Sequence, residues 1–235
     1  MLTLTDLRLR LGSFTLTADW QVNPGERIAL IGPSGAGKST LLSAIAGFLP
    51  PTSGHIRWNG QDLGPPGTRP ISILFQDQNL FPHLTIAQNL GLGLNPSLRL
   101  TPAQHGAVDD ALTKVGLAGF GTRKPAQLSG GQQSRAALAR ALLRAKPLLL
   151  LDEPFAALGP ALKAEMLDLV TQVLDATQAA LLMITHDPVD ALHLCNHTVL
   201  VADGVAHAPQ PTTALLANPP AALQAYLGSN PLNLI

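Results

Sequence analysis

The feature that most constrains the fold is a glycine-rich segment between an apolar run and a helix-like run. Residues 27–49 read RIALIGPSGAGKSTLLSAIAGFL, and GPSGAGKS within them matches the pattern G-x-x-x-x-G-K-[ST]. The run RIALI predicts a buried strand, and the residues after the glycines predict a helix. A strand, a tight glycine loop and a helix N-terminus together present backbone N–H groups to phosphate oxygens. The segment therefore predicts a phosphate-binding loop in an α/β fold.

The residue types of this loop suit nucleotide phosphates. Lys38 is placed to reach the β- and γ-phosphates, the Ser39 hydroxyl to bind Mg²⁺, and Thr40 to contact the α-phosphate. The alternative is a glycine-rich turn with an exposed lysine, but a chance match in a chain of this length occurs about once in a hundred sequences of average composition. The predicted phosphate-binding residues are Gly32, Pro33, Ser34, Gly35, Ala36, Gly37, Lys38, Ser39 and Thr40.

Four further apolar runs are typical of strands buried on both faces of a parallel sheet. They are ISILF (71–75), LLLLD (148–152), ALLMIT (180–185) and TVLVAD (198–203). Helices are predicted at 161–176 and 187–195, so that strands and helices alternate along the chain. The tail from Pro209 is predicted to form short helices on the surface. With 235 residues, of which 46% are hydrophobic, we expect a single α/β domain, 1–235, with a mainly parallel sheet.

Residues 85–145 differ because they contain no strand-like run. Thr101 and Pro102 provide a helix N-cap and a proline at the first helical position, and Gln104 completes a capping box. This helix is expected to end near Gly116. The stretch is therefore predicted to be a mainly helical lobe inserted into the α/β core.

Two adjacent carboxylates end the run LLLLD. Asp152 and Glu153 are followed at once by Pro154, and a buried charge is costly unless it has a partner. In phosphate-loop folds, an Asp at the end of a neighbouring strand helps to hold the Mg²⁺ that the loop hydroxyl binds. Asp152 is therefore predicted to hold the cation, and Glu153 to act as general base on the attacking water. The alternative is a pair of solvated loop acids, which the phosphate loop earlier in the chain disfavours.

The motif LSGGQ, at residues 128–132, precedes a run with helical spacing and three arginines. Ser129 suits an N-cap, and the two glycines let a phosphate approach the positive end of the helix. By itself the motif fits a capped helix after a turn. Together with GPSGAGKST, LLLLDEP and a histidine after the next strand, in this order, it resembles the ATP-binding subunit of ABC transporters. The resemblance covers essentially the whole chain.

The resemblance implies that ATP and Mg²⁺ are the cofactors, and it implies further site residues. Gln76 in ILFQ matches the family's glutamine that contacts Mg²⁺ or water and couples ATP to the membrane partner. His186 in MITHD matches the histidine that contacts the γ-phosphate. The family's signature closes on ATP held by the opposite subunit, so a homodimer with two sandwiched ATPs is implied. The matching signature residues are Ser129, Gly130, Gly131 and Gln132.

The family's architecture is also implied. It is a P-loop NTPase core with an N-terminal antiparallel β subdomain and an inserted helical lobe, here 85–145, that carries the signature. No C-terminal regulatory domain is expected, because the chain stops at Ile235.

Two positions depart from the family pattern. The family commonly reads S-x-L-D after the second acid, whereas this chain reads AALG at 156–159. Gly159 removes a carboxylate and is expected to weaken communication between the two ATP sites. The family also stacks adenine on an aromatic side chain, a contact worth roughly 1 kcal/mol, where this chain has Leu11. Phe14, the nearest aromatic, either replaces this contact or is an ordinary strand core residue.

The phrase LFQ…NLFPHLT is similar to importer ATPases, and residues 69–100 resemble especially the ATP-binding subunit of thiamine importers. The resemblance implies an ATP-hydrolysing subunit that energises uptake of thiamine or its phosphates. The alternatives are an ATPase for ferric iron, molybdate or polyamine import, or a nucleotide-gated binding module with low turnover. A soluble ABC ATPase of DNA repair or translation would carry coiled-coil insertions or tandem cassettes, which this sequence lacks.

The resemblance implies a membrane partner and, indirectly, a periplasmic one. An integral membrane permease is expected to dock near Gln76 to Gly93, and a periplasmic binding protein acts indirectly. Four apolar side chains of this segment either form the floor of the docking site or pack the core of the lobe. They are Leu80, Phe81, Leu84 and Ile86.

Composition limits the remaining functions. Fifteen basic residues balance fifteen acidic ones, so no nucleic-acid partner is expected. No run approaches the roughly 20 apolar residues of a membrane helix, and the first ten residues lack a signal-peptide core. The single cysteine, Cys195, cannot form an internal disulfide, which favours a reducing compartment. Together with these limits, the resemblance implies a peripheral protein on the cytoplasmic face of the inner membrane.

Overall fold

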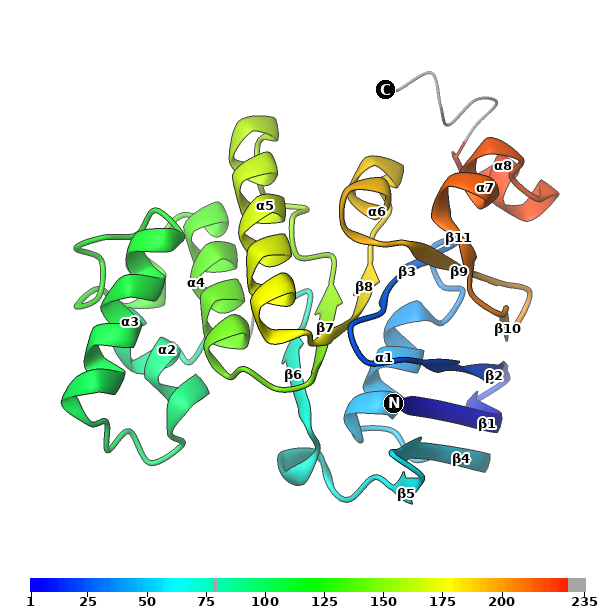
Figure 1. The fold of residues 1–235 in the computed structure, drawn as a ribbon, viewed down its shortest axis with the longest axis horizontal. Coiled ribbons are helices and arrows are strands. Elements are labelled where there is room, and N and C mark those ends of the chain that lie inside the picture. The colour runs from blue at the N-terminus through cyan, green and yellow to red at the C-terminus, as the bar shows by residue number, and fades with distance from the viewer. Residues whose placement is uncertain (78–79, 228–235) are drawn as a thin grey trace.

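The structure is a computed structural model that describes residues 1–77 and 80–227. Its strands are β1 Leu2–Leu11, β2 Phe14–Val22, β3 Arg27–Ile31, β4 Ser53–Trp58, β5 Gln61–Asp62, β6 Ile71–Leu74, β7 Leu148–Asp152, β8 Ala180–Ile184, β9 His197–Ala202, β10 Val205–Ala206 and β11 Gln210–Pro211. They join into one sheet in the order β5-β4-β1-β2-β10-β9-β3-β8-β7-β6, with β11 paired to β9 (Figure 1).

One half of the sheet is parallel. Strands β9, β3, β8, β7 and β6 run parallel to one another. The five apolar runs noted in the sequence form these five strands, and the strand ends differ from the expected ones by at most one residue. The predicted α/β core with parallel strands is confirmed, within a sheet that is mixed as a whole.

Strands β1, β2, β4 and β5 pair antiparallel with one another and confirm the expected N-terminal β subdomain. Strand β1 pairs antiparallel with β2 and with β4, and β4 pairs with β5. The register of β1 shifts between Leu4 and Leu7, where Asp6 has a positive φ of 44°. A β-bulge adds one residue and reverses the alternation of side chains. Leu7 is therefore buried on the same face as Leu4, although the two are an odd number of residues apart.

Two separate apolar cores lie on the two faces of the parallel strands. In β3, Ile28 and Leu30 pack into the core with α1 and the antiparallel strands. Ala29 and Ile31 point the other way, into the core shared with helices α2 to α7. Because successive strand residues face opposite sides, burial on both faces explains why these strands read as continuous apolar runs.

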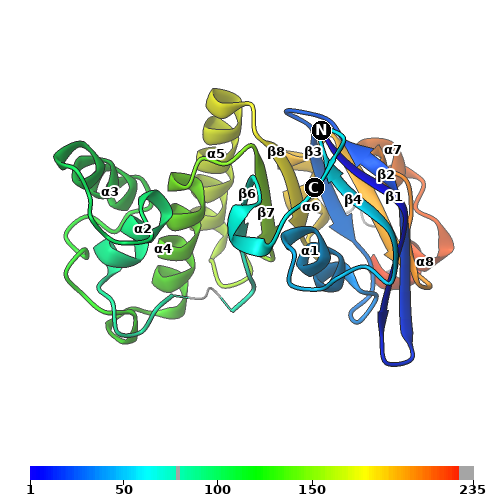
Figure 2. The ribbon, with the colours of Figure 1, turned by 90° about the horizontal axis from the view of Figure 1, so that it is seen from below.

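The helices are α1 Lys38–Ala46, α2 Ile86–Leu94, α3 Pro102–Lys114, α4 Gly130–Leu143, α5 Pro160–Thr177, α6 Pro188–Leu194, α7 Thr212–Ala217 and α8 Ala221–Leu227, with short 3₁₀ turns at Pro66–Thr68 and Pro125–Gln127. Helices α2, α3 and α4 lie together at one end of the molecule, far from the antiparallel strands (Figures 1 and 2). Thr101 N-caps α3 and forms the predicted capping box with Gln104. The Arg135 guanidinium of α4 donates to the carbonyl oxygens of Val115 (2.6 Å) and Gly116 (3.2 Å), just past the end of α3.

The C-terminal segment differs from the expectation of surface helices. Helices α7 and α8 form, but Leu215, Leu216 and Leu223 are buried in the core. The tail therefore covers one side of the sheet and does not lie loosely on the surface. Among the described residues, none of the helices combines the length and the hydropathy needed to cross a membrane.

Candidate nucleotide-binding site

The predicted phosphate loop connects β3 to α1. Gly37 N-caps α1 with a φ of 99°, a conformation that favours glycine. Gly32 is needed for a different reason: a Cβ there would lie 2.0 Å from the carbonyl oxygen of Val201 on β9. The loop can follow its path across the sheet only because residue 32 has no side chain.

Gly32→Ala is expected to lower the free energy of unfolding by about 2–4 kcal/mol, because the methyl group forces a backbone shift in a packed region. Gly35→Ala is the matched control. Gly35 has open space around its Cβ position, so only its positive φ of 78° adds a cost of about 1 kcal/mol. Urea unfolding of both variants measures the difference. Equal destabilisation would mean that the contact with Val201 does not constrain the loop.

Lys38 is the first residue of α1, and its ammonium group lies in the mouth of the loop. Nζ donates to the carbonyl oxygens of Gly32 (2.7 Å) and Pro33 (2.9 Å). Burial lowers the pKa of Lys38, and the carboxylates of Glu153 and Asp152 oppose this shift. The three charged groups therefore belong to one site at the carboxyl ends of β3 and β7.

Asp152 ends β7 and its side chain is only 5% exposed. Burial raises the pKa of Asp152, whereas a hydrogen bond donated by the Ser39 hydroxyl lowers it and the charge of Glu153 raises it further. Its Oδ1 is buried and accepts no hydrogen bond from any residue in the described part of the chain. A buried carboxylate oxygen without a partner, next to a serine hydroxyl, suits the hard oxygen coordination of Mg²⁺. The residues present therefore fit the expected cation.

Glu153, after β7, lies beside His186, after β8. Glu153 Oε2 and His186 Nδ1 are 3.6 Å apart. Glu153 has a positive φ of 48°, which is uncommon for a residue with a long side chain and costs about 1–3 kcal/mol. The hydrogen bond from its N–H to the Ile184 carbonyl oxygen (3.0 Å) holds this conformation. The turn directs Glu153 away from Asp152, toward the end of β8.

Gln76 follows β6 at the same edge of the sheet. It is exposed, and the charge of its neighbour Asp77 contributes to the raised pKa of Asp152. The segment 76–93, predicted to dock a permease, includes residues 78 and 79, which lie outside the described residues. Within the rest of it, Ile86 is fully buried in the core of the lobe, so it cannot form the floor of a docking site.

The signature residues begin α4. The Ser129 hydroxyl accepts from the Gln132 N–H (3.3 Å), and the Gln132 side chain accepts from the Ser129 N–H (2.9 Å). Both Ser129 and Gly130 are exposed. Helix α4 packs against α2, α3, α5 and β6, whereas α1 packs against β1 and β7. One chain therefore does not bring its own signature to its own phosphate loop.

Phe14 lies against the phosphate loop. A Cβ on Gly37 would be 2.6 Å from the tip of the Phe14 ring, which also packs against the core around β1 and β2. Leu11, across the hairpin from Phe14, is 49% exposed. Both earlier interpretations of Phe14, adenine contact and strand core, are compatible with this position.

Gly159 occupies the N-cap position of α5 without a side-chain cap. A Cβ at Gly159 would meet no atom within 4 Å, and its φ of −71° is open to any residue. An aspartate at this position would therefore cap the helix.

Gly159→Asp is expected to raise the free energy of unfolding by about 1 kcal/mol. The side chain would accept an N–H bond, complement the helix dipole and restrict the unfolded chain. Gly159→Ala is the control, since it keeps only the effect on the unfolded chain. Thermal unfolding should show an increase in Tm of about 2–4 °C for Gly159→Asp. A smaller increase than for Gly159→Ala would contradict the capping role.

Sequence reasoning missed two features near the site. Lys38 Nζ lies 6.0 Å from the ring centroid of Tyr226 on α8, and burial raises the pKa of this tyrosine. Lys163, at the start of α5, is ion-paired with Asp187 and Asp190, which follow His186. Only the run THD, which places an acid next to His186, hints at the second feature.

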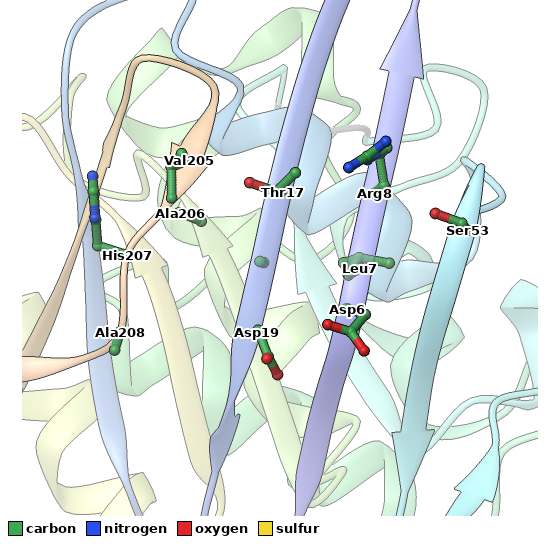
Figure 3. A pocket seen from close by; sticks show the side chains of 11 residues that line it. Asp6, Leu7, Arg8, Thr17, Asp19, Ser53, Val205, Ala206, His207 and Ala208 are labelled. Atoms are coloured by element: carbon green, nitrogen blue, oxygen red, sulfur yellow. The ribbon is translucent and has the colours of Figure 1, made fainter.

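A depression of about 510 Å³ in the described surface lies elsewhere. It lies on the antiparallel sheet, where Arg8 and Thr17 sit opposite each other on β1 and β2 and His207 lies beyond β10 (Figure 3). It contains none of the predicted site residues. The chemistry of the loop, and not the size of the hollow, identifies the nucleotide site.

Comparisons with known proteins identify the family of the chain. The ABC transporter family model matches residues 16–156. The thiamine import ATP-binding protein ThiQ of Cereibacter sphaeroides is 65% identical over 230 residues, which cover 97% of this chain and 100% of that protein. ThiQ of Ruegeria sp. (strain TM1040) is 55% identical over 231 residues, with 97% and 100% coverage.

Solved structures are similar as well. The ATP-binding cassette MJ0796, in a dimeric post-hydrolysis state bound to ADP and Pi, superposes with a TM-score of 0.81 and 27% identity, over 90% of this chain and 99% of that one. The P-loop NTPase fold is thereby confirmed. The motifs, their geometry and these matches lead to one conclusion: the chain belongs to the ABC transporter family, among its ATP-binding subunits.

Proposed function

We propose that this chain is the ATP-hydrolysing subunit of an importer of thiamine or its phosphates. The observation that carries the proposal is 65% identity, over 97% of the chain, to a protein named for thiamine import. The site supports the hydrolytic part, because the phosphate loop, Asp152, Glu153 and His186 meet at one edge of the sheet. The transported solute does not contact these residues, so the substrate assignment depends on the relatives.

At the site, backbone N–H groups of the loop and Lys38 hold the β- and γ-phosphates of ATP. Ser39 and Asp152 would hold Mg²⁺, with Gln76 as a further oxygen ligand. Mg²⁺, when bound, neutralises charge on the phosphate oxygens. Glu153 takes a proton from the attacking water, and His186, 3.6 Å away, orients this carboxylate and the γ-phosphate.

The working form is a homodimer, in which residues 85–145 serve as the lobe that presents the signature. Ser129 and Gln132 hydrogen-bond to each other in the capping box. The other N–H groups of the first turn of a helix have no hydrogen-bond partner within the helix. These donors belong to α4, which packs against α2, α3, α5 and β6, whereas Lys38 begins α1, which packs against β1 and β7. A second copy can bring them to the γ-phosphate, which is the arrangement that two sandwiched ATPs require.

A permease docks on the groove between β6, α2 and α4. This cavity, of about 210 Å³, is lined by Phe75, Phe81, Leu92 and Arg140 among others. Phe81 is 46% exposed, and the Arg140 guanidinium lies 5.9 Å from its ring. Aromatic and arginine side chains in a groove are typical anchors of an interface. Docking holds the chain at the cytoplasmic face of the membrane. On the opposite, periplasmic face, a binding protein delivers solute to the permease.

Phe81→Ala is expected to weaken binding of the permease by about tenfold or more, as is usual for a central aromatic anchor. Val205→Ala is the control, since Val205 is a partly exposed apolar residue on β10, away from the groove. Co-purification with the permease, or binding to permease in nanodiscs, measures the effect. Equal binding by the two variants would place the docking site elsewhere.

The proposed function is tested by reconstituting the chain with its permease in proteoliposomes. Thiamine and its binding protein should stimulate Mg-dependent ATP hydrolysis and ATP-driven uptake, whereas ferric iron, molybdate and polyamines should not. Stimulation by one of the other solutes would change the substrate assignment. Tight ATP binding with hardly any cleavage in a single turnover would instead favour a nucleotide-gated binding module, which the loss of the aspartate at Gly159 motivates.

A further inference from the structure

We infer that Lys163 is a positioning residue for ATP hydrolysis: through Asp187 and Asp190 it holds the segment that carries His186 against the start of α5, beside Glu153. The inference rests on the proposed function as an ATPase. It concerns a side chain that does not itself reach the reacting atoms.

The contacts of Lys163 are dense for a residue next to a surface loop. Nζ contacts a carboxylate oxygen of Asp187 and lies 2.6 Å from Oδ1 of Asp190. The side chains of Lys163 and Asp190 are only 20% and 5% exposed. An ion pair with this much burial is costly to break, because the remaining partner keeps an uncompensated charge.

Hydrogen bonds of Asp187 and Asp190 hold the chain on both sides of His186. The Asp190 Oδ2 accepts from the Thr185 hydroxyl (3.0 Å), and the same hydroxyl accepts from the Asp187 N–H (3.0 Å). Asp187 also N-caps α6 by accepting from the Val189 N–H (2.9 Å). Residues 185 and 187 are thus tied to one network, and His186 between them has little freedom to shift.

Lys163 connects this network to the other half of the site. Its N–H donates to the carbonyl oxygen of Gly159 (2.9 Å), in the loop that follows Glu153. A small cavity of about 90 Å³ is lined by Glu153, Lys163, His186 and Asp190. The distance between Glu153 and His186 is therefore set by an element that touches both of their segments. A displacement of about 1 Å at such a site can lower the rate by about 10².

A second tie between the same two helices offers a matched control. His193 Nε2 of α6 lies 3.0 Å from Asp168 Oδ1 of α5, in a more exposed pair further along both helices. If Lys163 only docks α6 on α5, loss of this second tie should have a similar effect on activity. If Lys163 positions His186, loss of the Lys163 contacts should lower activity far more than loss of the contact between His193 and Asp168.

The experiment compares steady-state hydrolysis of Mg-ATP by the full chain and its variants, with thermal unfolding as a check on folding. Lys163→Met is expected to lower kcat by about 10–100-fold while KM stays within about twofold. Lys163→Arg should restore most of the rate, since it keeps the charge between the two carboxylates. Asp168→Asn should keep kcat within about twofold.

A double-mutant cycle decides whether Lys163 acts through the histidine. In a His186→Ala background, Lys163→Met should change kcat by less than about twofold, because the group that it positions is gone. Should Lys163→Met not fold, Asp190→Asn, which keeps a hydrogen-bonding side chain of the same shape, takes its place with the same expectations.

The inference is overturned if Lys163→Met keeps the wild-type kcat, if Asp168→Asn loses as much activity, or if the loss persists undiminished in the His186→Ala background. An inactive wild-type chain would remove the proposed function, and with it this inference. An active wild type with an unaffected Lys163→Met variant would overturn the inference alone.

Discussion

Glu153→Gln is expected to lower the rate of ATP hydrolysis by about 10²–10⁴, the usual contribution of a general base. An amide has the size of the carboxylate but cannot take a proton from water. The backbone conformation at residue 153, with its φ of 48°, is as accessible to Gln as to Glu. ATP binding should therefore persist, and the variant should accumulate as the ATP-bound dimer. Phosphate release at saturating Mg-ATP and size-exclusion chromatography with ATP measure the two effects.

Glu165→Gln is the control for this prediction, because Glu165 is an exposed carboxylate on α5 outside the site. Its hydrolysis rate should match that of the wild type. If Glu153→Gln kept more than about a tenth of the wild-type rate, Glu153 would not be the base.

Asp152→Asn is expected to have opposite effects on activity and stability. Mg-dependent hydrolysis should fall by at least about 10², because a cation ligand that helps to stabilise charge in the transition state is lost. The nucleotide-free protein should become more stable, since the variant no longer buries a charge with a partnerless Oδ1. Urea unfolding without nucleotide and phosphate release with Mg-ATP measure the two effects. Loss of activity together with loss of stability would mean that Asp152 supports the fold and not the cation.

The same variant tests the pH dependence of stability. Burial raises the pKa of Asp152 above its ordinary value of 3.8. The folded state then binds more protons than the unfolded state between the two pKa values, so the contribution of Asp152 to stability falls as pH rises through this window. The stability gained by Asp152→Asn should therefore be small near pH 3.8 and grow until pH passes the folded pKa. A gain that is independent of pH would contradict the assigned cause.

Local sequence patterns predicted much of the site. The glycine pattern with a strand before it and a helix after it located the phosphate loop, and the two acids after the leucine run 148–151 were identified as Asp152 and Glu153. The capping box at Thr101 and the N-cap at Ser129 were equally readable, because their hydrogen bonds join residues three apart. Patterns of this kind depend on neighbouring residues only.

Other features could not be predicted because they depend on distant packing. The sequence MLTLTDLRLR does not predict the bulge at Asp6, which reverses the alternation of buried and exposed side chains along β1. The segment LFPHLTI does not distinguish Ile86, which is buried, from Phe81, which is exposed. The roles of Gly159 in the intersubunit loop and of the signature in the dimer stay predictions.

The sequence by itself determined which residues carry the phosphate chemistry and which strands form the parallel sheet, because glycine turns, helix caps and doubly buried strands are short-range choices. Only the tertiary structure decided which groups lie beside that chemistry. Lys163 reaches Asp190, and Tyr226 reaches Lys38, across long stretches of chain. Such contacts arise when separate elements pack on the two faces of one sheet, and no local pattern encodes the distance between them.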